Sequence, residues 1–533
     1  MGDRAERRRL LVSWSIVLCI AIAHRLSLFL WHRRDLEALI ADNQVWYIFQ
    51  YLPREMLRDH LVAAMLLLQQ TPPVPNLLMG LALKGFGWPA GVAQALIGVQ
   101  SLASILTTAV LVHLLSVLYP RRVVLWTVLG LLFVLNTDLV VLEYNNMGQI
   151  IYGPLSMLAV LVILDAVVCL RRTGRLPGAV VAGVALGLLV LTRASWYLFP
   201  IPCLLLVATL APARRVAAVV ACLVPLLLLQ GGWAIKNYAV YGVLSPVTST
   251  WGGLHAFAGL RSAGLGPEFD AVRLDRRVAA QGAPRPGPSL EEARQRDAEV
   301  ERKFGLANPA FNTLSFSLGT NDLQRDFFYF VRTHPRAMLS KYAKAYHVFW
   351  QPIAYYGRQF VGLFAVSNRI AHPFDVAEIA RQLLAGSLPD EQYIASGSHP
   401  LVSLDPTDKP VQRRYAPTDL HTARWIEPFA RLVEIVGVHL LLPLVGVLWL
   451  TGRTRRGRSI APLFDPLRMA ALLVAATIYG YLAVTVNLVE TSENMRYRLE
   501  VEPVIWIITL VCITELARLL QARTAGVAGE FAR

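Results

Sequence analysis

The sequence predicts an all-α polytopic membrane protein with about ten transmembrane helices (10–12). Of its 533 residues, 55% are hydrophobic and 16% are charged, whereas a soluble domain carries about 25% charged residues. The mean hydropathy is +0.47. Apolar runs long enough to cross a bilayer, about 20 residues, recur along the chain. This composition excludes a chain built only from soluble domains, a disordered chain and a collagen.

Ten apolar runs qualify as candidate spans: residues 11–31, 91–118, 123–141, 149–170, 177–194, 196–211, 216–234, 429–451, 466–487 and 499–519. They divide the chain into three parts. Residues 1–234 form an N-terminal transmembrane module whose first outer loop is 32–90. Residues 235–428 form a large periplasmic or extracellular segment, and residues 429–533 carry the last spans.

Arginine clusters precede the first run and follow the second, fourth, sixth and eighth runs, and they predict the topology. The formal net charge is +15, and short basic loops stay in the cytoplasm. Both termini are therefore predicted to be cytoplasmic. The bias of arginine over lysine is typical of GC-rich coding and favours the inner membrane of a bacterium. The N-terminal run could be an uncleaved anchor or a cleavable signal peptide. The clusters are Arg4 with Arg7, Arg8 and Arg9; Arg121 and Arg122; Arg171, Arg172 and Arg175; Arg214 and Arg215; and Arg453, Arg455, Arg456 and Arg458.

The outer segments are predicted to be mainly helical. In the first outer loop, residues 43–58 and 74–86 are amphipathic or too short to span, which favours two interfacial helices. In the large segment, Ser289 and Glu292 form a capping-box pattern that predicts a helix through Lys303. Pro335 predicts a break between two helices. The remaining expectations are a loop over 262–290, helices over 321–333 and 336–350, and a helix over 373–385.

Several functional classes lack their motifs. No phosphate-binding loop, dinucleotide fingerprint, zinc-protease or serine-hydrolase motif is present, and no aromatic-lined basic face predicts nucleic-acid binding. The five cysteines lie in apolar runs and are predicted to be small buried hydrophobes rather than disulfides or metal ligands. They are Cys19, Cys169, Cys203, Cys222 and Cys512. The sequence supports no cofactor and no metal site.

Ionisable residues gather at the predicted outer ends of the spans, where each could be functional or simply tolerated. Asp42 could act as a general base or could cap an interfacial helix. An arginine there could bind phosphate or extend to lipid headgroups. For the set, an outer site is the economical interpretation. Its members are Asp42, Glu143, Arg193, Lys236, Arg496, Arg498 and Glu502.

Motifs in a fixed order on one predicted side resemble the GT-C superfamily of polytopic glycosyltransferases. The branch is that of bacterial enzymes related to protein O-mannosyltransferases, aminoarabinose transferases and lipopolysaccharide-core galacturonosyltransferases. The resemblance covers about residues 10–350 and 430–520. The matching residues are Asp42 with Trp46; Gln70-Thr71-Pro72-Pro73; Lys84-Gly85-Phe86-Gly87; Glu143-Tyr144-Asn145-Asn146 with Tyr152; Leu191-Thr192-Arg193; Trp233 to Tyr238 with Tyr241-Gly242; His334-Pro335, Lys344 and Phe349-Trp350; and Arg496 with Arg498.

The resemblance implies that residues 1–234 are the catalytic module of a glycosyltransferase. A sugar would pass, with inversion, from a polyprenyl-phosphate donor to a lipid, glycan or protein acceptor at the outer face of the membrane. Asp42 would be the base. Donor phosphate would be bound by Arg193, Lys236, Arg496 and Arg498, and further site candidates are Trp46, Glu143, Asn145, Tyr152, Glu493 and Glu502.

Two positions depart from the family's pattern. Asn43 stands where the family often has a second carboxylate, so a divalent-metal role has no support in the sequence. Lys236 replaces a commoner arginine and lacks its planar fork for phosphate. Other function classes stay open. They are a transporter or flippase for lipid-linked sugars, a ligase or polymerase that moves a whole glycan, and a non-catalytic sensor or scaffold.

Overall fold

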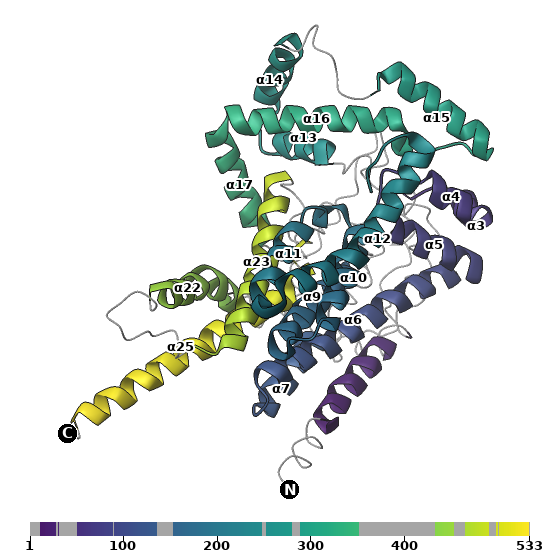
Figure 1. Cartoon of the computed structure of the whole chain (residues 1–533). Coiled ribbons are helices and arrows are strands. Elements are labelled where there is room, and N and C mark those ends of the chain that lie inside the picture. Colours follow the sequence, from purple (N-terminus) through teal and green to yellow (C-terminus); the bar gives the residue numbers. More distant parts are fainter. Residues whose placement is uncertain are drawn as a thin grey trace, which may run out of the picture.

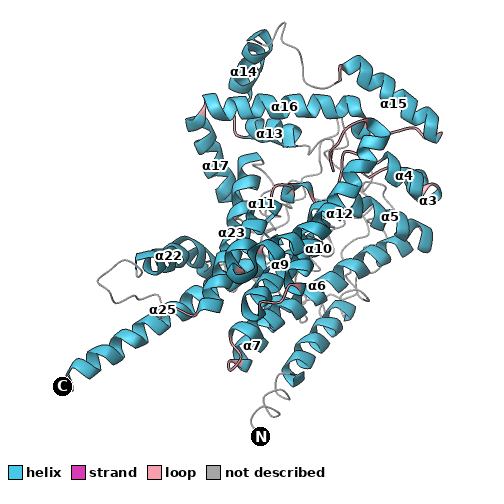
Figure 2. Cartoon of the chain, in the orientation of Figure 1, coloured by secondary structure: helices cyan, strands magenta, loops and turns pink. Residues whose placement is uncertain are grey.

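A computed structural model describes most of the chain, and what it describes is helical (Figure 2). The described residues are 11–27, 30, 51–88, 90–135, 153–247, 252–279, 288–350, 432–451, 464–489, 497–498 and 500–531. Across these ranges the elements are helices, turns and loops without a strand. The prediction of an all-α chain is confirmed for this part.

Six helices of the described part are long and apolar enough to cross a membrane. All six coincide with predicted spans, and several begin or end a few residues away. They are α6 (Ala90–Leu118), α9 (Gly153–Thr173), α12 (Arg215–Tyr241, preceded by η2 over Pro212–Arg214), η6 (Gly437–Leu441) with α22 (Leu442–Thr451), α23 (Pro466–Val489) and the first part of α25 (Glu502–Phe531).

The other four predicted spans correspond to shorter apolar helices, so a count of ten is not confirmed. These helices are Leu11–Ser27, α7 (Val123–Val134), α10 (Pro177–Thr192) and α11 (Pro200–Leu210). Pro177 and Pro200 each open their helix, where the missing N–H of proline costs nothing. The backbone of Arg193 is extended and ends α10, and the short η1 helix (Ala194–Trp196) leads towards α11.

Small residues bring α10 close to α12. A Cβ atom at Gly183 would collide with the backbone oxygen of Cys222, and one at Gly187 would lie 2.7 Å from a side-chain carbon of Leu229. Close helix contact through small residues is usual for apolar bundles. All five cysteines are free. Three of them are buried, as predicted, whereas Cys19 is exposed.

The described part of residues 235–428, the predicted outer segment, contributes five α-helices after α12: α13 (Gly252–Ser262), α14 (Gly266–Ala279), α15 (Leu290–Phe304), α16 (Leu314–Thr333) and α17 (Pro335–Phe349). Figure 1 shows α16 lying across the end of the bundle, with α17 leading down to α23. The capping box at Ser289 is present, and its backbone N–H lowers the pKa of the Glu292 carboxyl. The predicted break at Pro335 is also confirmed.

The prediction of a loop over 262–290 is wrong, because α14 occupies residues 266–279. Arg273 and Arg276 of α14 both form ion pairs with Asp326 of α16, a carboxylate that is 1% exposed. A buried carboxylate needs such partners, so a contact distant in sequence stabilises a helix that local composition does not favour. The predicted helix over 373–385 lies outside the described residues.

The described part of the predicted first outer loop, residues 51–88, forms α3 (Arg54–Asp59), α4 (Leu61–Leu67) and α5 (Pro73–Gly85). The predicted helix over 74–86 is therefore confirmed. Of the predicted helix over 43–58, only the part from residue 51 is described, and α3 occupies its end. Asn76 of α5 accepts a hydrogen bond from the backbone N–H of Leu52 at 2.9 Å, which ties the start of this segment to α5.

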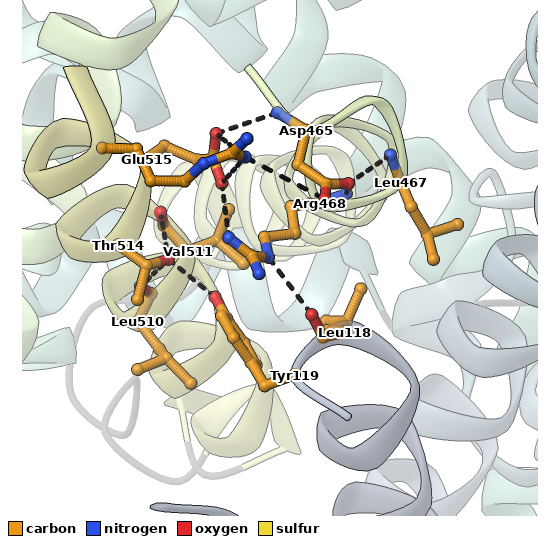
Figure 3. Close-up of polar contacts among 10 residues, drawn as sticks. Leu118, Tyr119, Asp465, Leu467, Arg468, Leu510, Val511, Thr514 and Glu515 are labelled. Carbon is orange, nitrogen blue, oxygen red and sulfur yellow. Dashed lines mark hydrogen bonds and ion pairs between the residues drawn. The ribbon is translucent and has the colours of Figure 1, made fainter. Parts of the chain in front are cut away.

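Polar contacts join three spans at one end of the bundle (Figure 3). Glu515 of α25 is fully buried and accepts from Arg468 of α23 at 2.9 Å. Arg468 also donates to the backbone oxygen of Leu118, the last residue of α6, at 3.1 Å. Tyr119 contacts the hydroxyl of Thr514 at 2.8 Å. The end of α6 and the beginning of α23 therefore lie together, in agreement with the predicted alternation of the spans.

Candidate functional site

Arg193 lies directly after α10 and is almost fully buried. Its Nη1 donates to Oε1 of Glu500, a carboxylate without solvent exposure. The other oxygen of Glu500 accepts from the indole Nε1 of Trp196 at 2.9 Å. The Arg193 guanidinium also lies over the ring of Tyr497, 4.1 Å from its centroid. One buried carboxylate thus holds a cation and an indole from the chain between α10 and α11.

Arg498 forms a second ion cluster beside the same segment. It is 1% exposed, and its Nη1 donates to Glu502 and, at 3.2 Å, to Glu434. Glu434 is buried and accepts from the indole Nε1 of Trp506 at 2.7 Å. This cluster joins the beginning of the span over Leu432–Thr451 to the beginning of α25.

Lys236 lies near the end of α12 and contacts the first outer segment. Its Nζ donates to the backbone oxygen of Leu68 and, at 3.3 Å, to that of Leu66, at the C-terminus of α4. A cation is favourable there, because the carbonyl groups at a helix C-terminus carry partial negative charge. The same ammonium lies 4.0 Å from the ring centroid of Trp233.

The family-like Phe349-Trp350 pair lies at the end of α17 among aromatic side chains of two spans. The hydroxyl of Tyr346 contacts Nε2 of His439 at 2.6 Å and the hydroxyl of Tyr479. The ring centroids of Trp350 and His439 are 5.3 Å apart. His439 belongs to the π-helical turn η6. These contacts join the outer helices to the C-terminal spans.

Four of the sequence-predicted site residues are described, and the structure brings them together in part. Arg498 and Glu502 contact each other directly. Arg193 contacts the same segment through Tyr497 and Glu500. Lys236 instead contacts the end of α4. The remaining candidates lie outside the described residues: Asp42, Trp46, Glu143, Asn145, Tyr152, Glu493 and Arg496.

Sequence reasoning missed the partners of the two arginines. Glu434 and Glu500 were not among the predicted site residues, although each lies within a predicted span, near its beginning. The sequence carries a signal for these two partners. A carboxylate that must be buried beside apolar residues requires a cation or a hydrogen-bond donor. The runs Arg498-Leu499-Glu500-Val501-Glu502 and Val433-Glu434 place acids and a base at the beginnings of spans.

The described part of the site therefore holds two guanidinium groups in fixed positions through ion pairs with buried carboxylates. Among the described residues, no group of three or more histidine, cysteine, aspartate or glutamate side chains could hold a metal ion. No family model, no curated protein and no solved structure matches the chain. The GT-C resemblance therefore rests on the motifs quoted above.

Proposed function

We propose that this chain is a membrane glycosyltransferase that moves a sugar from a polyprenyl-phosphate donor to an envelope acceptor at the outer face of a bacterial inner membrane. The acceptor is a lipid, a glycan or a protein. The reaction inverts the anomeric carbon. Asp42 takes the proton of the acceptor hydroxyl, the new glycosidic bond forms, and the bond from the anomeric carbon to the phosphate oxygen breaks.

The observation that supports this function most is the meeting of two family-like motifs. Arg193 ends the Leu-Thr-Arg motif, and Tyr497 and Arg498 belong to the motif before the last span. These motifs lie about 300 residues apart in the chain, yet Arg193 stacks on Tyr497 and pairs with Glu500. Each motif alone is degenerate. Their contact at the ends of two helices is what a shared anion site requires.

In the proposed reaction, the arginines stabilise the charge on the leaving phosphate. The leaving phosphate monoester gains negative charge in the transition state, so preorganised cations beside it lower the barrier. Guanidinium groups match phosphate oxygens better than an ammonium does. In this proposal Arg193, Arg496 and Arg498 bind that phosphate. Lys236 supports the site from α12, where it holds the end of α4.

A transporter or flippase for lipid-linked sugars is the second candidate, favoured by one observation. Nδ1 of His113 on α6 lies 2.9 Å from Oδ1 of Asp165 on α9, and both residues belong to helices that could span a membrane. Ionisable pairs at membrane depth often belong to transport pathways. His113 lies five residues before the end of α6 at Leu118, or about 7.5 Å along the axis. The pair therefore lies nearer one end of the helix than its middle.

Cells that lack the protein separate these functions. A glycosyltransferase should leave its polyprenyl-phosphate sugar to accumulate, accessible to an impermeant periodate reagent from outside. A flippase should leave a lipid-linked sugar that this reagent reaches only after lysis. A ligase or polymerase should leave a lipid diphosphate that carries a whole glycan. If the pool of polyprenyl-phosphate sugar is unchanged, the proposed donor is wrong.

A further inference from the structure

Two buried arginines at the ends of the spans each pair with a carboxylate that also accepts from an indole, and Arg498 pairs with a second carboxylate, Glu502, as well. In the first triad, Glu500 accepts from Arg193 through one oxygen and from Trp196 through the other. In the second triad, Glu434 accepts from Arg498 through Oε2 and from Trp506 through Oε1. Both triads adjoin residues 497–502, so the arrangement occurs twice around one short segment.

The indole is what fixes each carboxylate. A carboxylate that contacts an arginine alone can rotate and carry the long side chain with it. When its second oxygen accepts from a ring N–H, both oxygens have a set direction. An arginine side chain loses up to about 2 kcal/mol of conformational entropy when it is ordered. In these triads much of that entropy is already lost in the protein without ligand.

Stability alone is a weak reason for such triads. A buried ion pair recovers little net stability, because both charges must be removed from water. The opposite end of the bundle shows a buried carboxylate with a different environment. Glu515 accepts from Arg468, from Arg518 and from the backbone N–H of Asp465, and it joins helix ends (Figure 3). None of the described hydrogen bonds to its two oxygens comes from an indole.

We propose that Glu500 and Glu434 are positioning residues that hold Arg193 and Arg498 in place for the phosphate of the lipid donor, which leaves as a monoester. This inference rests on the proposed function. A guanidinium is a rigid plane of N–H donors. Glu500 contacts that of Arg193, and Glu434 and Glu502 contact that of Arg498. Holding that plane still sets the direction in which the arginine meets phosphate oxygens.

The substitution Glu500→Gln tests the inference because it keeps size but removes charge. The amide must turn its NH₂ group towards either Arg193 or Trp196, both of which are donors. The arginine then loses its fixed position. Glu500→Asp keeps the charge on a shorter side chain and should rescue in part. Glu515→Gln is the matched control, since it removes the charge of another buried, arginine-paired glutamate on the same helix, α25.

The probe is farnesyl phosphate, measured by binding to the purified full chain in nanodiscs. Farnesol reports binding that does not need the phosphate, and phosphatidylglycerol reports binding of any lipid phosphate. We expect the wild type to prefer farnesyl phosphate. Glu500→Gln and Glu434→Gln should weaken that binding about tenfold or more, since loss of one charge-assisted hydrogen bond weakens binding about tenfold to a hundredfold. Glu515→Gln should bind as the wild type does.

The outcomes separate the inference from the proposed function. If the wild type binds farnesyl phosphate no better than farnesol or phosphatidylglycerol, the donor assignment fails and this inference fails with it. If the wild type prefers farnesyl phosphate and folded Glu500→Gln retains its affinity, only the positioning role is overturned. If Glu500→Gln does not fold, the affinity for farnesyl phosphate is measured in Glu500→Asp and in Trp196→Phe instead. Wild-type affinity in both of these would overturn the positioning role, and weakened affinity would support it.

Discussion

Gln69 and Asn312 are joined by two hydrogen bonds across 243 residues of sequence. The backbone N–H of Gln69 donates to Oδ1 of Asn312 at 3.0 Å, and Nε2 of Gln69 donates to the backbone oxygen of Asn312 at 2.7 Å. Asn312 also donates to the backbone oxygen of Leu67 at 2.8 Å. All of these groups are buried, so this contact fixes the first outer loop to the outer helices.

Asn312→Ala should therefore destabilise the protein. It removes the acceptor for two backbone N–H groups, those of Gln69 and Gln70, whereas the backbone oxygen of Leu67 keeps the Tyr241 hydroxyl as a donor. A buried polar group left without its partner costs about 1–3 kcal/mol, so a total on the order of 3 kcal/mol is expected. Chemical unfolding in detergent measures it. Gln295→Ala on the exposed face of α15 is the control, and equal losses in the two variants would contradict the prediction.

Gly183→Ala should destabilise the pair of α10 and α12. The new methyl group would collide with the backbone oxygen of Cys222, which cannot move without shifting α12. Overpacking of this kind costs about 1–3 kcal/mol. Gly231→Ala on α12 has open space around its Cβ and should be neutral or slightly stabilising. Comparison of the thermal unfolding midpoints tests this, and a Gly183→Ala midpoint equal to that of Gly231→Ala would rule it out.

Local chemistry explains which parts of the fold could be predicted. The helix α15 was predicted because Ser289 and Glu292 cap it through bonds three residues apart. The division between α16 and α17 followed from Pro335. The span positions followed from hydropathy alone. Each of these signals lies within a few residues of the feature that it predicts.

The contacts of the candidate site were not predictable in this way. The sequence placed Arg193 and Arg498 at span ends, but their choice of Glu500 and Glu434 depends on how helices distant in the chain meet. The helix α14 was missed for the same reason. Its Arg273 and Arg276 find Asp326, about 50 residues away, and this pairing outweighs a composition typical of a loop.

The predicted topology can be tested with two cysteine variants. Gln295→Cys lies on the exposed face of α15, and Arg175→Cys lies in the exposed turn between α9 and α10. In intact cells with a permeable outer membrane, an impermeant maleimide should label Gln295→Cys. It should label Arg175→Cys only after lysis, because basic turns stay in the cytoplasm. The wild type, with its five cysteines, gives the background. The reverse pattern would invert the topology.

A double substitution separates the structural and functional roles of Arg193. Arg193→Met leaves Glu500 buried without its cation, which should cost about 3–5 kcal/mol of unfolding free energy. Adding Glu500→Gln removes the uncompensated charge and should recover much of that stability. Neither variant should bind the donor phosphate, since the guanidinium is absent in both. If the double variant regains both stability and farnesyl phosphate binding, Arg193 serves the fold alone.

Asp42→Asn tests the proposed catalytic base, which lies outside the described residues. Asparagine keeps the size of the side chain and caps a helix as well as aspartate does, but it cannot accept the proton of an acceptor hydroxyl. A base contributes about 10²–10⁴-fold to the rate. The variant should insert and accumulate normally and transfer almost no sugar.

Transfer should be measured in membranes with matched protein levels, beside Asp35→Asn as a control from the same loop. If Asp42 only caps a helix, Asp42→Asn should be nearly as active as the wild type. Activity above roughly a tenth of wild type is a smaller loss than removal of a base produces, and it would end the catalytic assignment of Asp42. Glu37 and Glu55 would then be the next candidates in this loop, beside Asp35, which the control variant already tests, because the attack on the anomeric carbon still requires a proton acceptor.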